Sequence, residues 1–153
     1  EIIFEWSNLE CPYVKRHYGS NNMQTTQKFA KSKNVIWITV ISSAEGKQGY
    51  IQPNDAVNTF ASFGSFPDHI LVDENGDLGK KFNAKTTPHI FIADKNKNIV
   101  YQGAIDDAGG SRFWTTDLNQ STNFVKKVVN DIKSNKPPSV SKTRPYGCSV
   151  KYG

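Results

Sequence analysis

Residues 35–41 constrain the fold more than any other part of the sequence. They consist of β-branched residues and one tryptophan, and only Thr39 among them is polar. A continuous run of this kind is typical of a strand that is covered on both faces, as in the centre of a parallel sheet. Helical patterns precede and follow the run, so we expect a strand–helix–strand unit and an α/β fold.

The other predicted elements fit the same plan. Short apolar runs predict strands, and periodic apolar positions predict helices. The last helix cannot continue past Lys136-Pro137-Pro138. We expect strands at residues 2–5, 35–41, 69–72, 90–93 and 99–103, and helices at residues 12–18, 23–31, 53–63, 78–82 and 124–132. The predicted architecture is a sandwich with a mixed central sheet and helices on both faces.

One domain is expected for a chain of 153 residues without an internal repeat. We expect residues 1–135 to form this domain and residues 136–153 to form a tail that packs back on it. The chain lacks an initial Met and opens almost inside a strand, which predicts that residues have been removed upstream. No apolar run approaches the length of a membrane span.

Cys11 lies where the first predicted strand gives way to the first predicted helix. Pro12 suits the first helical position, where its missing N–H costs no hydrogen bond. Unpaired N–H groups and the positive end of the helix dipole favour the thiolate there, and the thiolate is the nucleophilic form of cysteine. Helix N-termini can lower a cysteine pKa from about 8.5 to roughly 3.5–7.5. The alternative is a buried cysteine that only fills space in the core.

Cys148 is the second cysteine and lies beside Gly147 in an extended tail. Three arrangements are open: Cys148 resolves an oxidised Cys11, the two form a permanent crosslink, or they never meet. A crosslink that closes a loop of more than 100 residues would stabilise the fold by about 4.7 kcal/mol on the chain-entropy model. Redox partnership is favoured because Cys11 already lies at the start of a helix.

Two classes of function find no support in the sequence. The net charge is +5, but the basic residues are dispersed and not interleaved with aromatic residues, so no nucleic-acid partner is expected. Cys11, Cys148, His17 and His89 are potential metal ligands, but no pair has the close spacing of a metal motif. We therefore expect neither a metal nor another cofactor.

Four stretches of the chain, in order, resemble motifs of one protein family. They are Trp-x-Asn-x-x-Cys-Pro-x-Val-Lys at residues 6–15, Lys-Thr-Thr-Pro-His at 85–89, Gly-x-Ile-Asp-Asp at 103–107 and Pro-Tyr-Gly-Cys-Ser-Val-Lys at 145–151. The chain resembles the redoxin branch of the thioredoxin-like superfamily, also called alkyl hydroperoxide reductase/thiol-specific antioxidant (AhpC/TSA), in a bacterial form with a single active-site cysteine. The resemblance covers essentially the whole chain and implies a thioredoxin-like three-layer sandwich.

The resemblance also implies roles for individual residues. Cys11 would be the attacking thiol, and Pro88 would be the cis-proline beside it, which is a rare backbone form. The backbone of Thr87 would then be free to pair with an extended peptide or with a mixed-disulfide partner. Pro12, Trp6 and Asn8 belong to the first motif and are expected to help form the binding site.

Glu5 stands six residues before Cys11, where thioredoxins keep a buried acid. The resemblance implies that its carboxylate accepts or returns a proton during disulfide exchange. The alternative is a charge at the edge of a strand that points to solvent. Arg16 and His17 follow on the predicted helix. Either could add positive charge near the thiolate, but a solvated helix face is the favoured interpretation for both.

The sequence also departs from the family patterns. Val14 occupies the position of the second cysteine of a thioredoxin, and Phe4 and Asn8 occupy the positions of the proline and threonine of a peroxiredoxin motif. These departures remove the local dithiol and count against peroxidase activity, although Asn8 or Ser7 could still donate hydrogen bonds.

The predicted function is a thiol–disulfide oxidoreductase in which Cys11 is the nucleophilic thiolate and Cys148 resolves the intermediate. The alternatives are a thiol peroxidase and a non-catalytic thioredoxin-like binding module. The expected partners are a protein or small-molecule disulfide, or a peroxide, together with an external thiol reductant. The resemblance and the missing N-terminus favour an exported, periplasmic protein, with a cytoplasmic setting left open.

Overall fold

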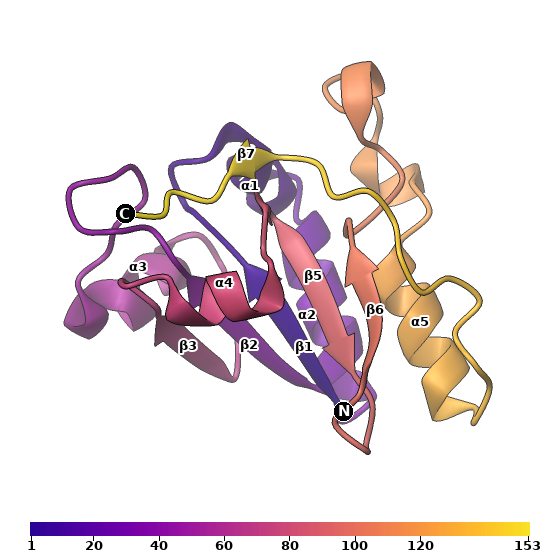
Figure 1. Ribbon diagram of the computed structural model, residues 1–153. Coiled ribbons are helices and arrows are strands. Elements are labelled where there is room, and N and C mark those ends of the chain that lie inside the picture. The colour runs from indigo at the N-terminus through magenta and orange to yellow at the C-terminus, as the bar shows by residue number, and fades with distance from the viewer.

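A five-stranded mixed sheet forms the centre of the protein, whose computed structural model describes residues 1–153 (Figure 1). The strand order is β3-β2-β1-β5-β6; β1, β2 and β3 run parallel, whereas β5 and β6 are antiparallel to their neighbours. The strands are β1 (Ile2–Trp6), β2 (Ile36–Ile41), β3 (His69–Val72), β5 (His89–Ala93) and β6 (Ile99–Gly103). The predicted fold class, a sandwich with a mixed central sheet, is confirmed.

Helices cover both faces of this sheet. The helices are α1 (Pro12–Gly19), α2 (Asn22–Ser32), α3 (Ala56–Ser62), α4 (Asp77–Phe82) and α5 (Phe124–Lys133). In Figure 1, α4 lies in front of the sheet and α2 behind it. Asn21, in the left-handed backbone region, separates α1 from α2 and gives the interruption that the sequence predicts. None of the helices is both long and apolar enough to cross a lipid bilayer.

The hydrophobic core explains why the central strands read as continuous apolar runs. Alternate residues of β1 enter different clusters: Ile3 joins the larger core under α1, α2 and α5, whereas Trp6 joins a smaller core on the opposite face. In β5, Ile90 faces the larger core and Phe91 the smaller one. Because both faces are covered, polar alternation is lost and the strand becomes apolar throughout.

Two short strands lie outside the predicted set. β4 (Thr86–Thr87) and β7 (Cys148–Ser149) form a separate antiparallel pair, in which Thr87 is opposite Cys148. Figure 1 shows how the chain reaches this position: the C-terminal tail leaves α5, runs beside β6 and crosses above α1 and β5. Two-residue strands have no periodicity to detect, so the sequence gives no signal for either of them.

Candidate redox site

Cys11 is the N-cap residue of α1, with Pro12 at the first helical position. Its sulfur is fully buried and lies 3.3 Å from the carbonyl oxygen of Thr87. No side chain caps α1, so the N–H groups of its first turn receive no side-chain acceptor. The positive end of the helix therefore faces the sulfur, and a thiolate formed here would be stabilised.

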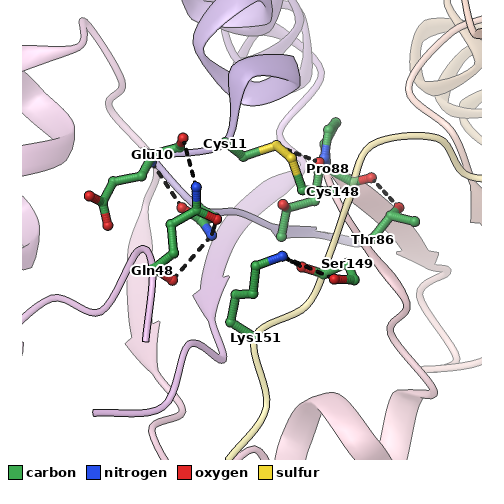
Figure 2. The surroundings of a disulfide bond; sticks show 10 residues. Glu10, Cys11, Gln48, Thr86, Pro88, Cys148, Ser149 and Lys151 are labelled. Atoms are coloured by element: carbon green, nitrogen blue, oxygen red, sulfur yellow. Dashed lines mark hydrogen bonds between the residues drawn. A yellow bond between two sulfur atoms is a disulfide. The ribbon is translucent and has the colours of Figure 1, made fainter. Parts of the chain in front are cut away.

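A disulfide bond joins Cys11 to Cys148, with 6.1 Å between their Cα atoms and a sequence separation of 137 residues (Figure 2). The arrangement in which the two cysteines never meet is therefore wrong. The expectation of a single active-site cysteine is not confirmed either, because the sulfur at the start of α1 is paired with the cysteine of the tail. Cys148 is half-buried, in contrast to Cys11.

The segment before Pro88 holds the tail cysteine in place. The Thr87–Pro88 peptide bond is cis, and Thr87 pairs with Cys148 in the β4–β7 ladder. Gly147 packs directly against the Thr87 carbonyl, so closely that a Cβ atom at this position would collide with it. The Thr87 backbone, which the resemblance implies is free for a peptide, is thus occupied by the protein's own tail.

Glu5 is the next-to-last residue of β1 and has no exposed surface, so the interpretation as a solvent-facing charge is wrong. Tyr18 donates a hydrogen bond to its carboxylate at 2.9 Å, and Trp37 and Thr39 each donate one at 3.0 Å. Burial raises the pKa of Glu5 from 4.5 to about 7, and the hydrogen bonds only partly oppose this rise. The pKa of Glu5 therefore lies close to neutral pH.

Two residues of the first motif position neighbouring segments. Trp6 donates a hydrogen bond from Nε1 to Ser42 at 3.0 Å, and its ring lies within the smaller core. Asn8 accepts a hydrogen bond from the Glu10 backbone at 2.9 Å and donates one to the Gln48 carbonyl at 3.3 Å. Asn8 therefore ties the 44–50 loop to the segment before Cys11, and its amide is already occupied.

For His17, the prediction of a solvated helix face is wrong. His17 is fully buried, and burial lowers its pKa to about 3. Asn22 donates to its Nδ1 at 3.0 Å, which leaves the proton on Nε2, 3.2 Å from the Tyr146 hydroxyl. Tyr146 in turn donates to the carboxylate of Asp106, which Asn22 also contacts at 3.3 Å.

We call these four residues, His17, Asn22, Asp106 and Tyr146, the Tyr146 network. Asp106 is buried, and its burial raises its pKa. Sequence reasoning assigned no role to Asp106 or Tyr146. The available signal was their presence in the third and fourth motifs, two stretches that share no predicted element.

Arg16 also lacks the free, solvated position that the sequence indicates. Its guanidinium group lies 5.2 Å from the centre of the Phe113 ring and donates to the Thr116 carbonyl at 2.6 Å. Phe113 belongs to a small cluster formed by the segment between β6 and α5. Arg16 thereby fixes this segment against α1, beside the Tyr146 network.

The redoxin family model matches residues 2–117. The chain belongs to the redoxin family. Its sequence matches no curated protein. Among solved structures, this redoxin is similar to a hypothetical protein from Sinorhizobium meliloti 1021, with 18% identity, a TM-score of 0.80, and coverage of 99% of this chain and 79% of that one.

Two further structures share the fold of this redoxin. A conserved protein from Geobacillus kaustophilus is 19% identical with a TM-score of 0.79, and the match covers 99% of this chain and 77% of that chain. A secreted disulfide oxidoreductase from Mycobacterium tuberculosis is 11% identical with a TM-score of 0.50, covering 77% and 79% of the two chains. The first two similarities extend over the tail as well as the sheet, so the path of the tail belongs to the shared fold.

Proposed function

We propose that this redoxin is a thiol–disulfide oxidoreductase whose redox centre is the Cys11–Cys148 pair. The observation that carries the proposal is the position of the disulfide: one of its sulfurs lies at the uncapped start of α1, beside the Thr87–Pro88 step. A purely structural crosslink needs no helix N-terminus. A reactive one benefits from it, because the dipole lowers the cost of the thiolate during exchange.

The proposed chemistry transfers two electrons between the cysteine pair and an external thiol or disulfide. In the reducing half of the cycle, two external thiols are oxidised to a disulfide and the Cys11–Cys148 bond is reduced to two thiols. In the opposite half, an external disulfide is reduced and the Cys11–Cys148 bond forms again. In the internal step Cys11 is the thiolate that attacks or departs, and in the sequence-based hypothesis Cys148 resolves the intermediate.

We propose that Glu5 is the proton-exchanging group of this cycle. Its pKa of about 7 lets it hold or release a proton under the same conditions in which thiols exchange. Cys11 and Tyr18 belong to the same buried cluster, and Tyr18 donates directly to Glu5. Trp6, Asn8 and Pro12 then serve to position the segment that carries Cys11, and Thr87 and Pro88 line the cysteine itself.

The decisive experiment measures the reduction potential of the pair. The oxidised protein is equilibrated in glutathione or dithiothreitol buffers, and the free thiols are counted after acid quenching. A potential above about −300 mV supports a working redox pair, whereas a more negative value identifies a permanent crosslink. In parallel, the wild type should reduce a small aromatic disulfide catalytically, and the Cys11→Ser variant should not.

Exported localisation follows as part of the same proposal. Disulfide bonds persist in oxidising compartments and are rare in the cytosol of mesophiles. We therefore propose a periplasmic or extracytoplasmic protein, in which residues 1–135 form the redox domain and residues 136–153 supply the second cysteine. Fractionation of the native host, with antibody detection of the full-length protein, tests the compartment; recovery in the cytosolic fraction would contradict it.

A further inference from the structure

We infer that Cys148, and not Cys11, is the sulfur that an external thiol attacks, and that the Tyr146 network enforces this choice by keeping the tail over Cys11. This inference rests on the proposed function and specifies the chemistry of its reducing half-cycle. In the sequence-based hypothesis Cys11 is the cysteine that reacts with the external partner, whereas here Cys148 is.

Burial separates the two sulfurs. Cys11 has no exposed surface and is packed in the larger core with Val14 and Leu9, whereas Cys148 is half-buried and is followed by the exposed Ser149. In Figure 2, Cys11 lies under the start of α1 and Cys148 lies on the tail that crosses the site. Thiol–disulfide exchange needs direct access to the attacked sulfur. Of the two cysteines in the oxidised protein, only Cys148 has any exposed surface from which a partner could approach.

The leaving group favours the same choice. When a thiolate attacks Cys148, it forms a new bond to that sulfur, and the electron pair of the old S–S bond goes to Cys11. Cys11 then departs as a thiolate at the N-terminus of α1, where the unpaired N–H groups stabilise it. A thiol with a lower pKa leaves faster, so attack on Cys148 is faster than attack on Cys11.

The tail is fixed on both sides of Cys148 by contacts that do not involve the disulfide. Before it, Thr143 bonds to the Tyr101 hydroxyl at 2.6 Å and accepts from the Ala104 backbone at 2.9 Å. After it, the Val150 backbone donates to Lys85 at 3.1 Å, and Tyr152 donates to the Ala84 carbonyl at 2.7 Å. None of these contacts is made by the disulfide itself, so we expect them to hold the tail over Cys11 after the bond opens.

The Tyr146 network is a further attachment of the tail, in which buried His17 and the buried Asp106 carboxylate hold the Tyr146 hydroxyl. Tyr146 lies two residues before Cys148, and its hydroxyl contacts both His17 of α1 and Asp106, three residues after β6. All four members have hydrogen-bond partners, and a satisfied polar network in the interior fixes its geometry. Gly109 lies directly beneath the Tyr146 ring, with no space for a side chain between them.

The covered site also selects the type of partner. Because β7 occupies the edge of β4, an extended peptide cannot pair there while the tail is docked. A cavity of about 630 Å³ opens next to Thr86 and Gly147, with Asp107 and Arg144 in its lining. The opposite charges beside this cavity suit a small thiol that itself carries both charges.

The test locates the first mixed disulfide. The oxidised full chain is mixed with glutathione, quenched with acid after short times, treated with N-ethylmaleimide and digested with trypsin without reduction. Cleavage after Lys15, Lys142 and Lys151 separates the two cysteines, in peptides 1–15 and 143–151. We expect glutathione on Cys148 and maleimide on Cys11, with the opposite pattern at least ten-fold rarer. Glutathione mainly on Cys11 would overturn the inference and leave the proposed redox function intact.

The Tyr146→Phe variant tests the network and keeps the ring that packs on Gly109. Loss of a hydrogen bond to a charged group weakens the attachment by about 10- to 100-fold. The share of glutathione found on Cys11 should therefore rise by a comparable factor, and Asp106→Asn should act in the same direction. Tyr50→Phe, at a tyrosine that contacts only Glu74 through its hydroxyl, is the matched control and should behave like the wild type. An unchanged share in both network variants, with folding verified by circular dichroism, would refute the role of the network.

The glutathione experiment distinguishes a failure of the proposed oxidoreductase function from a failure of the inference about Cys148. If glutathione forms no adduct with either cysteine at concentrations that reduce ordinary disulfides, the proposed oxidoreductase function fails. If adducts form but lie on Cys11, only the present inference fails.

Discussion

Replacement of Glu5 by glutamine should change how the stability of the protein depends on pH. The Glu5 carboxyl is fully buried and its pKa is raised from 4.5 to about 7, mainly because burial disfavours the charged form. Between these two values the folded protein binds more protons than the unfolded chain. Stability from this group is therefore fully present below pH 4.5 and is lost as the pH rises towards 7.

The magnitude follows from the size of the pKa change. One pKa unit corresponds to about 1.4 kcal/mol, so ionisation of Glu5 should cost the folded state roughly 3 kcal/mol by pH 8. Glutamine has the same shape and keeps a carbonyl oxygen for the hydrogen bonds from Trp37 and Thr39, but it does not ionise. We expect the Glu5→Gln variant to lack this loss of stability.

The assay is urea unfolding of both proteins in their oxidised form at pH 5, 6, 7 and 8. The difference in the free energy of unfolding, Glu5→Gln minus wild type, should grow by roughly 2.5 kcal/mol across this range, because contributions from all other groups cancel. Glu45→Gln, at an exposed position, is the control and should give a constant difference. A difference for Glu5→Gln that does not change with pH would refute the assignment of Glu5 as a buried acid that titrates near neutrality.

Three further predictions concern the tail and the Tyr146 network. Reduction of the disulfide, or the Cys148→Ser substitution, should lower the free energy of unfolding by at most about 5 kcal/mol. The measurement is urea unfolding with and without dithiothreitol. A larger loss would show that the tail contacts depend on the disulfide. Gly147→Ala should move β7 away from Thr87 and lower the equilibrium fraction of disulfide in a glutathione buffer. Gly46→Ala, at a glycine that also has a positive φ but lies in open space, should not. The lowered pKa of His17 means that the folded state resists protonation of this side chain, so the free energy of unfolding falls as the pH drops below 6.5. In urea unfolding, His17→Gln should lose less stability than the wild type between pH 6.5 and 4.5. An equal loss would contradict a buried neutral histidine.

The elements of the sheet could be predicted from the sequence because their signals are local. The apolar run at 35–41, the Pro12 helix start and the amphipathic pattern of α5 each depend on residues that are neighbours in the chain. Cys11 could be singled out in the same way, since a cysteine followed by proline after a strand has an immediate physical meaning. The structure places all of these elements within a few residues of the predicted positions.

The partners of these residues could not be predicted, because they depend on pairing between distant segments. Nothing near Glu5 in the sequence shows that Trp37 and Thr39 donate to it from the next strand. The sequence around His17 indicates only a polar residue on a short helix. In the structure, Tyr146 of the C-terminal tail lies against the buried His17 ring. The pairing of Cys11 with Cys148 likewise requires the tail to cross the sheet, which loop length alone does not determine.

The register of two short strands connects the redox centre to the rest of the fold. β4 would be an exposed edge without the tail, and exposed edges tend to pair with other chains. β7 covers this edge with Thr87 opposite Cys148, and the Cys11 sulfur lies beside the Thr87 carbonyl. A slip of one residue would turn the Cys148 side chain to the other face of the ladder and away from Cys11. Tyr146 and Gly147 exclude that slip, the first through the network and the second through its close contact with Thr87. The disulfide therefore forms because the strand register brings its sulfurs together, and a change that shifts this register should abolish the redox pair even when both cysteines remain.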